Sequence, residues 1–171
     1  LARGGLEVLL WGRDAAKVAA LAASHRHPQV AGDLPATLAI TADASRLAGA
    51  DLMLWAVPTQ HTASSARALR DAIPAGIPLV SLAKGLEQGT LRRVSEILAA
   101  ELPGRPVLAV SGPSHAGEVL SGKPACLVVA GPEAVANEVQ RRLHGRAFRL
   151  YTSTDLLGVE LAGAFKNVIA I

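Results

Sequence analysis

The chain has 171 residues, of which 50% are hydrophobic, 18% charged and 3% aromatic, and its formal net charge is +3. This composition is enough for one compact domain with a core of alanine, leucine and valine. The basic residues are spread without runs, which fits a small phosphorylated ligand at least as well as a nucleic acid. No apolar stretch approaches the roughly 18 residues of a membrane span, and we expect no signal peptide. The single cysteine, Cys126, lies in an apolar run, so we expect it to fill the core in a reducing compartment such as the cytoplasm.

Short apolar runs alternate with helical patterns along the chain. The runs predict strands at 6–12, 37–41, 51–58, 77–85, 106–114, 125–131 and 148–153. The patterns between them predict helices at 15–25, 43–50, 64–73, 90–102, 116–122, 132–143 and from 155 onward. Because the strands lack polar alternation, both of their faces are expected to be buried. The sequence therefore predicts an α/β fold with a doubly wound, mainly parallel sheet.

Two features concern the limits of this fold. The turn at 151–155 is the candidate boundary between a sheet domain, residues 1–151, and the first helix of an all-α domain, residues 152–171. Residues 1–5, LARGG, resemble the tail of a helix with a glycine cap, and no helix-stop signal precedes Ile171. We therefore expect a fragment of a longer protein.

Candidate ligand residues follow the predicted strands, because open α/β sheets bind ligands beyond the carboxyl ends of their strands. Arg13 follows the first strand and suits the 2′-phosphate of NADP. Asp14 leaves two interpretations open, since it could bind the ribose of NAD or cap the next helix. Thr59 and Gln60 follow the third strand, a weak indication of a cofactor surface.

Two further strand ends carry polar groups. Lys84 with Gly85 is either a phosphate or hydroxyl ligand or a solvated loop lysine. The stretch SGPSHAGEV, 111–119, places Gly112, Ser114 and free backbone N–H groups at a helix start, which is either an anion site or an ordinary capped turn. His115 in this stretch is expected to be exposed rather than catalytic.

Lys166 lies within the nearly apolar segment VELAGAFKNVIAI, 159–171. On a helical wheel it shares the face of Val159 and Ala162, whereas Glu160 and Asn167 lie on a separate stripe. An ammonium among apolar residues either extends to water or lines a pocket as a general acid or anion ligand. The residues around Thr152–Asp155 are typical of a helix start, with Thr152 and Asp155 forming a loose capping box.

Other chemistries find no support in the motifs. The five histidines lack metal-ligand spacing, so no metal site is expected. No G-x-S-x-G elbow, P-loop or G-x-G-x-x-G motif is found.

Five stretches together resemble bacterial NAD(P)-dependent glycerol-3-phosphate dehydrogenase, in the order and approximate spacing of that family. They are LWGRD (10–14), ADLMLWAVPTQ (50–60), VSLAKGLE (80–87), SGPSHAGEV (111–119) and RLYTSTDLLGVELAGAFKNVIAI (149–171). The resemblance implies a Rossmann-like fold that here lacks the first strand, the glycine loop and most of the C-terminal helical domain.

The resemblance also implies roles for individual residues. Lys166, in GAFKN, matches the family's catalytic lysine, and Lys84 matches a lysine that touches both cofactor and substrate. Gly112 and Ser114 match substrate-binding positions, whereas Ala116 borders the cofactor and Arg13 lies near its adenosine phosphate. His115 departs from the phenylalanine usual in the family.

The implied reaction is the reduction of dihydroxyacetone phosphate to sn-glycerol 3-phosphate for glycerophospholipid synthesis in the cytoplasm. The implied cofactor is NADP, with NAD and a homodimeric state left open. A related hydroxyacid or ketopantoate dehydrogenase is the alternative enzyme, and a non-catalytic NADP-binding module is the alternative of another class. Neither alternative accounts as well for SGPS followed by GAFKN.

Overall fold

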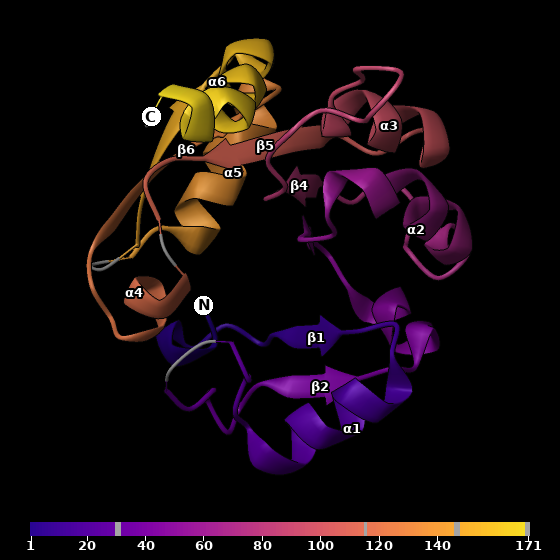
Figure 1. Cartoon of the computed structure of the whole chain (residues 1–171), viewed down its shortest axis with the longest axis vertical. Helices are drawn as coiled ribbons and strands as arrows, with labels where there is room; N and C mark the ends of the chain where they lie inside the picture. The colour runs from indigo at the N-terminus through magenta and orange to yellow at the C-terminus, as the bar shows by residue number, and fades with distance from the viewer. Residues whose placement is uncertain (30–31, 115, 146–147, 170–171) are drawn as a thin grey trace.

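The computed structural model describes residues 1–29, 32–114, 116–145 and 148–169, with the side chains at 116 and 167–169 excepted. Figure 1 shows two bodies of secondary structure, one around a two-stranded sheet and one around a five-stranded sheet. Both have helices packed on strands, as the alternation of patterns predicts. The predicted α/β class with a mainly parallel sheet is confirmed.

The larger sheet has the strand order β3-β4-β5-β6-β7. Its strands are β3 (Met53–Trp55), β4 (Leu79–Ser81), β5 (Val107–Ser111), β6 (Ala125–Ala130) and β7 (Phe148–Ser153). Neighbours pair in parallel except for β5 and β6, which are antiparallel. The short excursion between β5 and β6 therefore returns the chain beside β5 in the opposite direction, a reversal that the sequence did not predict.

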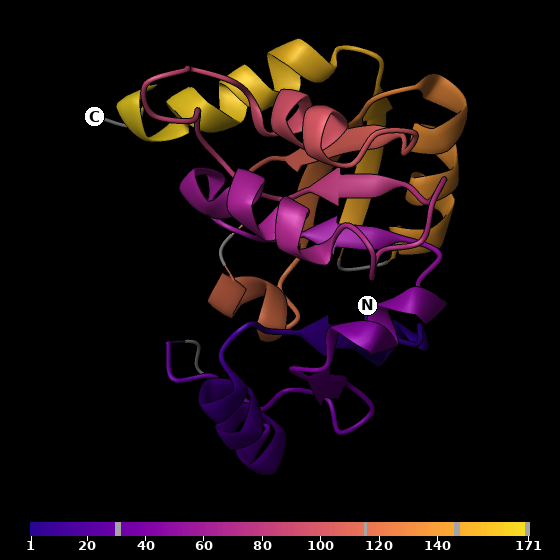
Figure 2. The same cartoon turned by 90° about the vertical axis from the view of Figure 1, so that its right-hand side faces the viewer.

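Helices cover both faces of this sheet, as Figure 2 shows from the side. They are α2 (Thr62–Leu69) with the short η3 (Thr59–His61) before it, α3 (Val94–Glu101), α5 (Glu133–Leu143) and α6 (Leu156–Ile169). The short helix α4 (Ala116–Leu120) instead lies off this sheet, near the N-terminal residues (Figure 1). Consecutive strand residues point to opposite faces, and they join different apolar clusters. Leu79 packs in the cluster of α2 and α3, whereas Val80 packs in the cluster of α5. The centre of the sheet, at β4 and β5, is therefore buried on both faces. The expected burial of both faces is wrong for β6 and β7, where Cys126 and Tyr151 are exposed.

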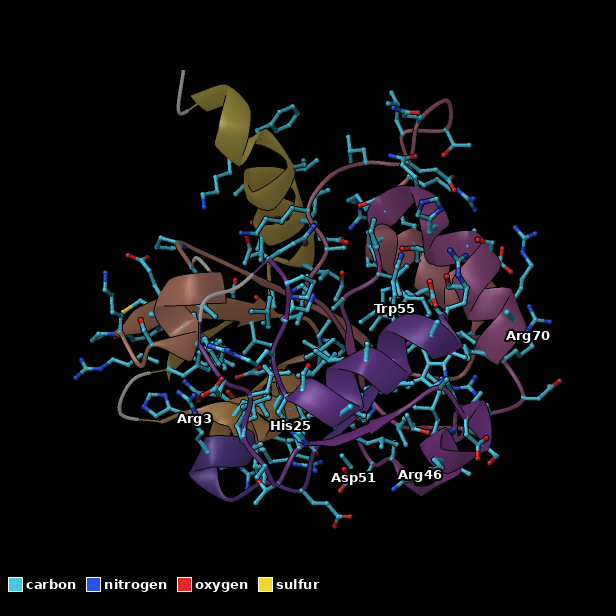
Figure 3. All side chains as sticks on the ribbon, turned by 60° about the horizontal axis from the view of Figure 1, so that its bottom comes forward. Arg3, His25, Arg46, Asp51, Trp55 and Arg70 are labelled. Carbon is cyan, nitrogen blue, oxygen red and sulfur yellow. The ribbon has the colours of Figure 1, made fainter. Side chains whose placement is uncertain are left out.

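The smaller body, which we call the β1–β2 region, spans residues 1–49. It contains η1 (Ala2–Gly4), β1 (Leu9–Trp11), α1 (Ala15–Ser24), β2 (Ala39–Thr41) and η2 (Ala44–Gly49). β1 and β2 pair in parallel. Arg3 connects this region to α4 by donating a hydrogen bond to the carbonyl of Leu120, and it donates a second one within the region to the carbonyl of Asp33. Figure 3 labels Arg3 on the side of the molecule opposite Arg70.

Three predicted local features were wrong. The helix predicted at 90–102 begins only at Val94, because Leu91 adopts a left-handed backbone with φ of 57°. Cys126 is exposed on β6 rather than buried in the core. The cap of α6 is Asp155, whose carboxylate accepts from the N–H of Gly158 at 2.8 Å, and not a box formed with Thr152.

Candidate functional site

Lys84 lies in the loop that connects β4 to α3, and this loop is fixed along its length. The hydroxyl of Thr59 donates to the carbonyl of Lys84 at 3.5 Å. The side chain of Gln60 donates to the Leu86 carbonyl and accepts from the N–H of Gln88, both at 2.9 Å. Thr59 and Gln60 thus hold the lysine loop, a role more specific than the cofactor surface predicted for them.

The ammonium of Lys84 reaches across the sheet edge to the loop that follows β5. Its Nζ lies 3.5 Å from the carbonyl oxygen of Gly112. The carboxyl ends of the parallel strands β4 and β5 meet at this edge. The structure therefore brings together two of the residues that the sequence selected separately.

Helix α6 crosses the same edge, with Gly163 buried at the crossing. A Cβ atom at Gly163 would lie 2.8 Å from Oγ of Ser111 and 3.8 Å from Cγ of Lys84. Only glycine lets the helix backbone come this close to β5 without moving Ser111. The approach carries Lys166, one turn further along α6, toward the Lys84 loop.

The charge of Lys166 acts on Lys84. Partial desolvation, and then the positive charge of Lys166, lower the pKa of Lys84 below its ordinary value of 10.5. Much of the Lys84 side chain remains exposed, and Lys166 is half-buried. The pair forms a concentrated positive charge beside the Gly112 loop, which suits an anionic ligand or a developing negative charge.

Gly112 occupies a position that excludes a side chain. Its φ is 147°, and a Cβ atom there would lie 2.7 Å from the carbonyl oxygen of Cys126. Ser114 is half-buried two residues later. The next helix, α4, has only five residues, so its dipole contributes little to an anion site. His115 and the side chain of Ala116 lie outside the described residues, so the predictions for them remain predictions.

Arg13 and Asp14 lie at the end of β1, in the other body of the molecule. Asp14 caps α1 by accepting from the N–H groups of Ala16 and Lys17, both at 3.1 Å. The hydrogen bond from the Lys17 backbone lowers the pKa of Asp14 below 3.8. Arg13 is exposed and has no hydrogen-bond or ion-pair partner among the described residues. The helix-cap interpretation of Asp14 is confirmed, and its binding of a ribose stays a prediction.

The buried stripe of α6 is not the one expected from the helical wheel. Ala162, on the expected apolar face, is exposed, whereas the Glu160 side chain is only 8% exposed. Glu160 accepts from the backbone N–H of Ser95 at 2.9 Å and from Arg93 at 2.8 Å. Sequence reasoning missed Arg93 and Ser95 altogether. The one sequence signal for this contact was the position of the Glu160 carboxylate on the same helical stripe as Gly163. The side chain of Asn167 lies outside the described residues.

Two surface hollows lie beside β7. One, of about 470 Å³, is lined by His144, Gly145, Arg149 and Tyr151. The other, of about 340 Å³, lies along residues 152–154 and the start of α5. Neither is lined by Lys84, which is exposed, or by Lys166, which is half-buried.

Neither a membrane-spanning helix nor a three-residue metal cluster is found in the described part of the chain. Its helices include none that combines the length and apolar character needed to cross a bilayer. Within the same residues, histidine, cysteine and acidic side chains form no cluster of three suited to a metal ion.

Comparisons with known proteins agree on one family. The sequence model described as "NAD-dependent glycerol-3-phosphate dehydrogenase N-terminus" matches residues 1–139. A curated glycerol-3-phosphate dehydrogenase [NAD(P)+] from Sinorhizobium fredii is 48% identical over 139 residues, covering 81% of this chain and 42% of the relative. One from Brucella canis is 41% identical over 174 residues, covering 99% of this chain and 53% of the relative.

A solved structure supports the same assignment. The crystal structure of glycerol-3-phosphate dehydrogenase from Coxiella burnetii superposes with a TM-score of 0.89 at 32% identity, covering 99% of this chain and 53% of that one. The chain therefore spans about half the length of the relatives that it matches. On this evidence, the chain belongs to the NAD-dependent glycerol-3-phosphate dehydrogenase family and matches its N-terminal part.

Proposed function

We propose that this chain supplies the cofactor half of an enzyme that reduces dihydroxyacetone phosphate to sn-glycerol 3-phosphate. The observation that carries the proposal is the meeting of Lys84, from the β4 loop, and Lys166, from α6, beside Gly112. The family membership and the names of the relatives support the same reaction. In this proposal residues 1–151 form the dinucleotide domain, and residues 152–171 begin the substrate domain.

The proposed roles follow from the chemistry of carbonyl reduction. A bound nicotinamide dinucleotide supplies the hydride. Negative charge then develops on the C2 oxygen of the substrate, and Lys166 stabilises that charge and donates the proton. Lys84 and the turn of Gly112 and Ser114 hold the substrate, whose own charge is negative. The open, cationic surface at the edge of the sheet suits such a phosphorylated ligand.

We propose NADP as the preferred cofactor, with Arg13, Lys84 and Ala116 at its binding surface. Two contacts support the preference. Asp14 already uses Oδ1 of its carboxylate to cap α1 and Oδ2 to pair with Lys17, which favours a structural role over binding of a ribose 2′-hydroxyl. The exposed Arg13 guanidinium suits a 2′-phosphate. The cytoplasmic location and the homodimeric state remain predictions of the family resemblance.

The test of the reaction follows NADPH absorbance with dihydroxyacetone phosphate for the chain, for Lys166→Ala and for Lys123→Ala as a matched lysine control. Because the relatives are about twice as long, the same set is measured in a chimera that adds the remaining half of the Brucella canis relative. We expect Lys166→Ala to lower kcat by about 10²–10⁴-fold while the Kd for NADPH changes little. Turnover retained by Lys166→Ala would exclude its role as proton donor. If NADPH binds but dihydroxyacetone phosphate is not reduced, the proposed substrate is wrong.

The cofactor preference has a separate test. Arg13→Ala should weaken NADPH binding by about 10–100-fold, since a charged hydrogen bond contributes about 1.5–3 kcal/mol. NADH binding should change by less than about 3-fold, because it lacks the phosphate that Arg13 contacts. Isothermal titration measures both, with Arg46→Ala as an exposed arginine control in the same region. Equal losses for the two cofactors would contradict the preference.

A further inference from the structure

A buried carboxylate joins α6 to the start of α3. The side chain of Glu160 is 8% exposed, and that of Arg93 is 20% exposed. Glu160 accepts hydrogen bonds from the backbone N–H of Ser95 at 2.9 Å, from the Ser95 hydroxyl, and from Arg93 at 2.8 Å. We call these three residues the Glu160 clamp. The proposed reaction assigns it no role.

The clamp serves α3 as a cap that comes from another helix. The residue before α3 is Arg93, whose side chain has no acceptor for the free N–H groups of the first turn. Glu160 supplies the acceptor from α6, at the positive end of the α3 dipole. The Glu96 carboxylate accepts hydrogen bonds only from the backbone N–H and one guanidinium nitrogen of Arg93. Burial opposes the charge of Arg93, but Glu96 and Glu160 outweigh it and raise its pKa.

The clamp lies between the two lysines of the site along the chain. The residue that begins the clamp, Arg93, ends the loop that carries Lys84, and Thr59 and Gln60 hold the other part of that loop. Glu160 belongs to the helix that carries Lys166. Gly163, one turn beyond Glu160, contacts Ser111 and approaches Lys84. Two points therefore fix α6 at this edge, the approach of Gly163 and the clamp, and the clamp is the polar one.

Stability alone is a poor explanation for this arrangement. A buried ion pair generally stabilises a fold no more than apolar residues of the same volume would. Directional bonds to one backbone N–H, one hydroxyl and one guanidinium instead define a single position of α6 along α3. An apolar contact would permit the helix to slide or rotate, and Lys166 would move with it.

We propose that Glu160 is a positioning residue whose clamp to Arg93 and Ser95 sets the placement of Lys166 relative to Lys84. The inference rests on the proposed function for the assignment of both lysines to the site. Glu160 acts through α6 and makes no hydrogen bond or ion pair with either lysine among the described residues.

The test measures how strongly the two lysines are coupled, and it uses the chain itself. The titration of Lys84 is followed by NMR of lysine side chains labelled with ¹³C at Cε, with and without Lys166→Met. We expect Lys166→Met to raise the pKa of Lys84 in the otherwise unchanged chain, because it removes a neighbouring positive charge. In the Glu160→Gln background we expect this response to fall to less than half, since α6 is no longer held in one position.

Glu96→Gln is the matched control. Glu96 also accepts hydrogen bonds from Arg93, but among the described residues it makes no hydrogen bond or ion pair with α6. It should leave the response of Lys84 unchanged. Amide chemical shifts of β5, β6 and β7 report whether each variant keeps its fold. If Glu160→Gln unfolds the chain, the double variant Arg93→Met with Glu160→Met removes both charges and is measured in the same way.

Each result decides the inference. A full response in the Glu160→Gln chain, or in the double variant where it is used, overturns the inference. An equal loss in Glu96→Gln also overturns it, because the effect would then belong to the start of α3 alone. If Lys166→Met does not change the pKa of Lys84 in the parent chain, the two lysines are not coupled, and the inference fails. Failure of the proposed function is seen separately, as turnover that persists in Lys166→Ala.

Discussion

The β1–β2 region and the five-stranded region bury their side chains to very different extents. Among the described residues, Leu47 is the one buried side chain before position 50, and α1 contributes none. The five-stranded region supplies the rest of the buried core, including a fully buried Trp55 whose indole N–H donates to Thr62 at 3.3 Å. The free energy of local unfolding increases with the number of buried apolar contacts. We therefore expect the β1–β2 region to unfold locally at a lower free energy than the five-stranded region.

The difference coincides with the chemistry proposed for each region. Lys84, Gly112, Ser114 and Lys166 all come from the five-stranded region, where packing on both faces fixes strand ends to within small tolerances. Arg13, proposed to bind the far end of the cofactor, comes from the loosely packed β1–β2 region. A phosphate contact by a long, flexible side chain tolerates movement that proton transfer does not.

The largest expected effect comes from truncating one leucine in each region. Leu108 is fully buried on β5, whereas Leu10 on β1 is 39% exposed. Leu108→Ala should lower the free energy of unfolding by about 4 kcal/mol, because it leaves a cavity. Leu10→Ala should cost less than about 1 kcal/mol. Urea denaturation measures both, and pulse proteolysis replaces it if Leu108→Ala is too unstable. Equal losses would contradict the looser packing of the β1–β2 region.

Two glycines with positive φ give a second comparison. Gly112→Ala should cost about 3 kcal/mol, because its Cβ would overlap the carbonyl of Cys126 in addition to the backbone strain. Gly5 has φ of 86° but nothing within 4 Å of its Cβ position, so Gly5→Ala should cost only about 1 kcal/mol. Thermal denaturation compares the two variants. A Gly5→Ala loss as large as that of Gly112→Ala would contradict the looser packing of the β1–β2 region.

The smallest effect concerns the pH dependence of α1. The pKa of Asp14 is lowered in the folded chain, so its cap stabilises α1 above the ordinary pKa of 3.8 and is lost as the pH falls through the folded value. The ¹³Cα shifts of residues 16–20 should therefore move toward coil values in acid. Asp14→Asn keeps a capping side chain that does not titrate, and it should remove this pH dependence. If the ¹³Cα shifts of Asp14→Asn change in acid in the same way, the pH dependence belongs to groups other than Asp14.

Local sequence patterns predicted most elements but not their mutual placement. The strand at Phe148–Ser153 was found with its predicted limits, and the helix at 15–25 differs by one residue. The reversed direction of β6 escaped prediction, because apolar runs carry no information about strand direction. The exposure of Cys126 on β6 also escaped prediction, because an apolar run does not show which helix covers which strand. In the structure α6 covers the part of the sheet nearer β5 and leaves Cys126 exposed.

The candidate site was predicted in its residues more than in its geometry. Lys84, Gly112 and Lys166 were selected from strand ends and from the family resemblance. Their roles remain predictions, although the structure gathers them at one sheet edge. The partners that hold them were not selected, because Glu160 and Ser95 are 65 residues apart in the chain. A helical wheel also misassigned the buried face of α6, since an ion pair and a glycine contact decide that face rather than apolar content.

The long-range reach of Glu160 has a consequence for the order in which the chain matures during synthesis. A ribosome releases residues from the N-terminus onward, and domains generally fold as units in that order. The Lys84 loop and α3 emerge well before α6, which contributes the second lysine and the last polar contact. Until α6 emerges, the start of α3 lacks the Glu160 acceptor, and a nascent chain carries Lys84 without Lys166. The charge pair is therefore completed in one late step, when α6 docks.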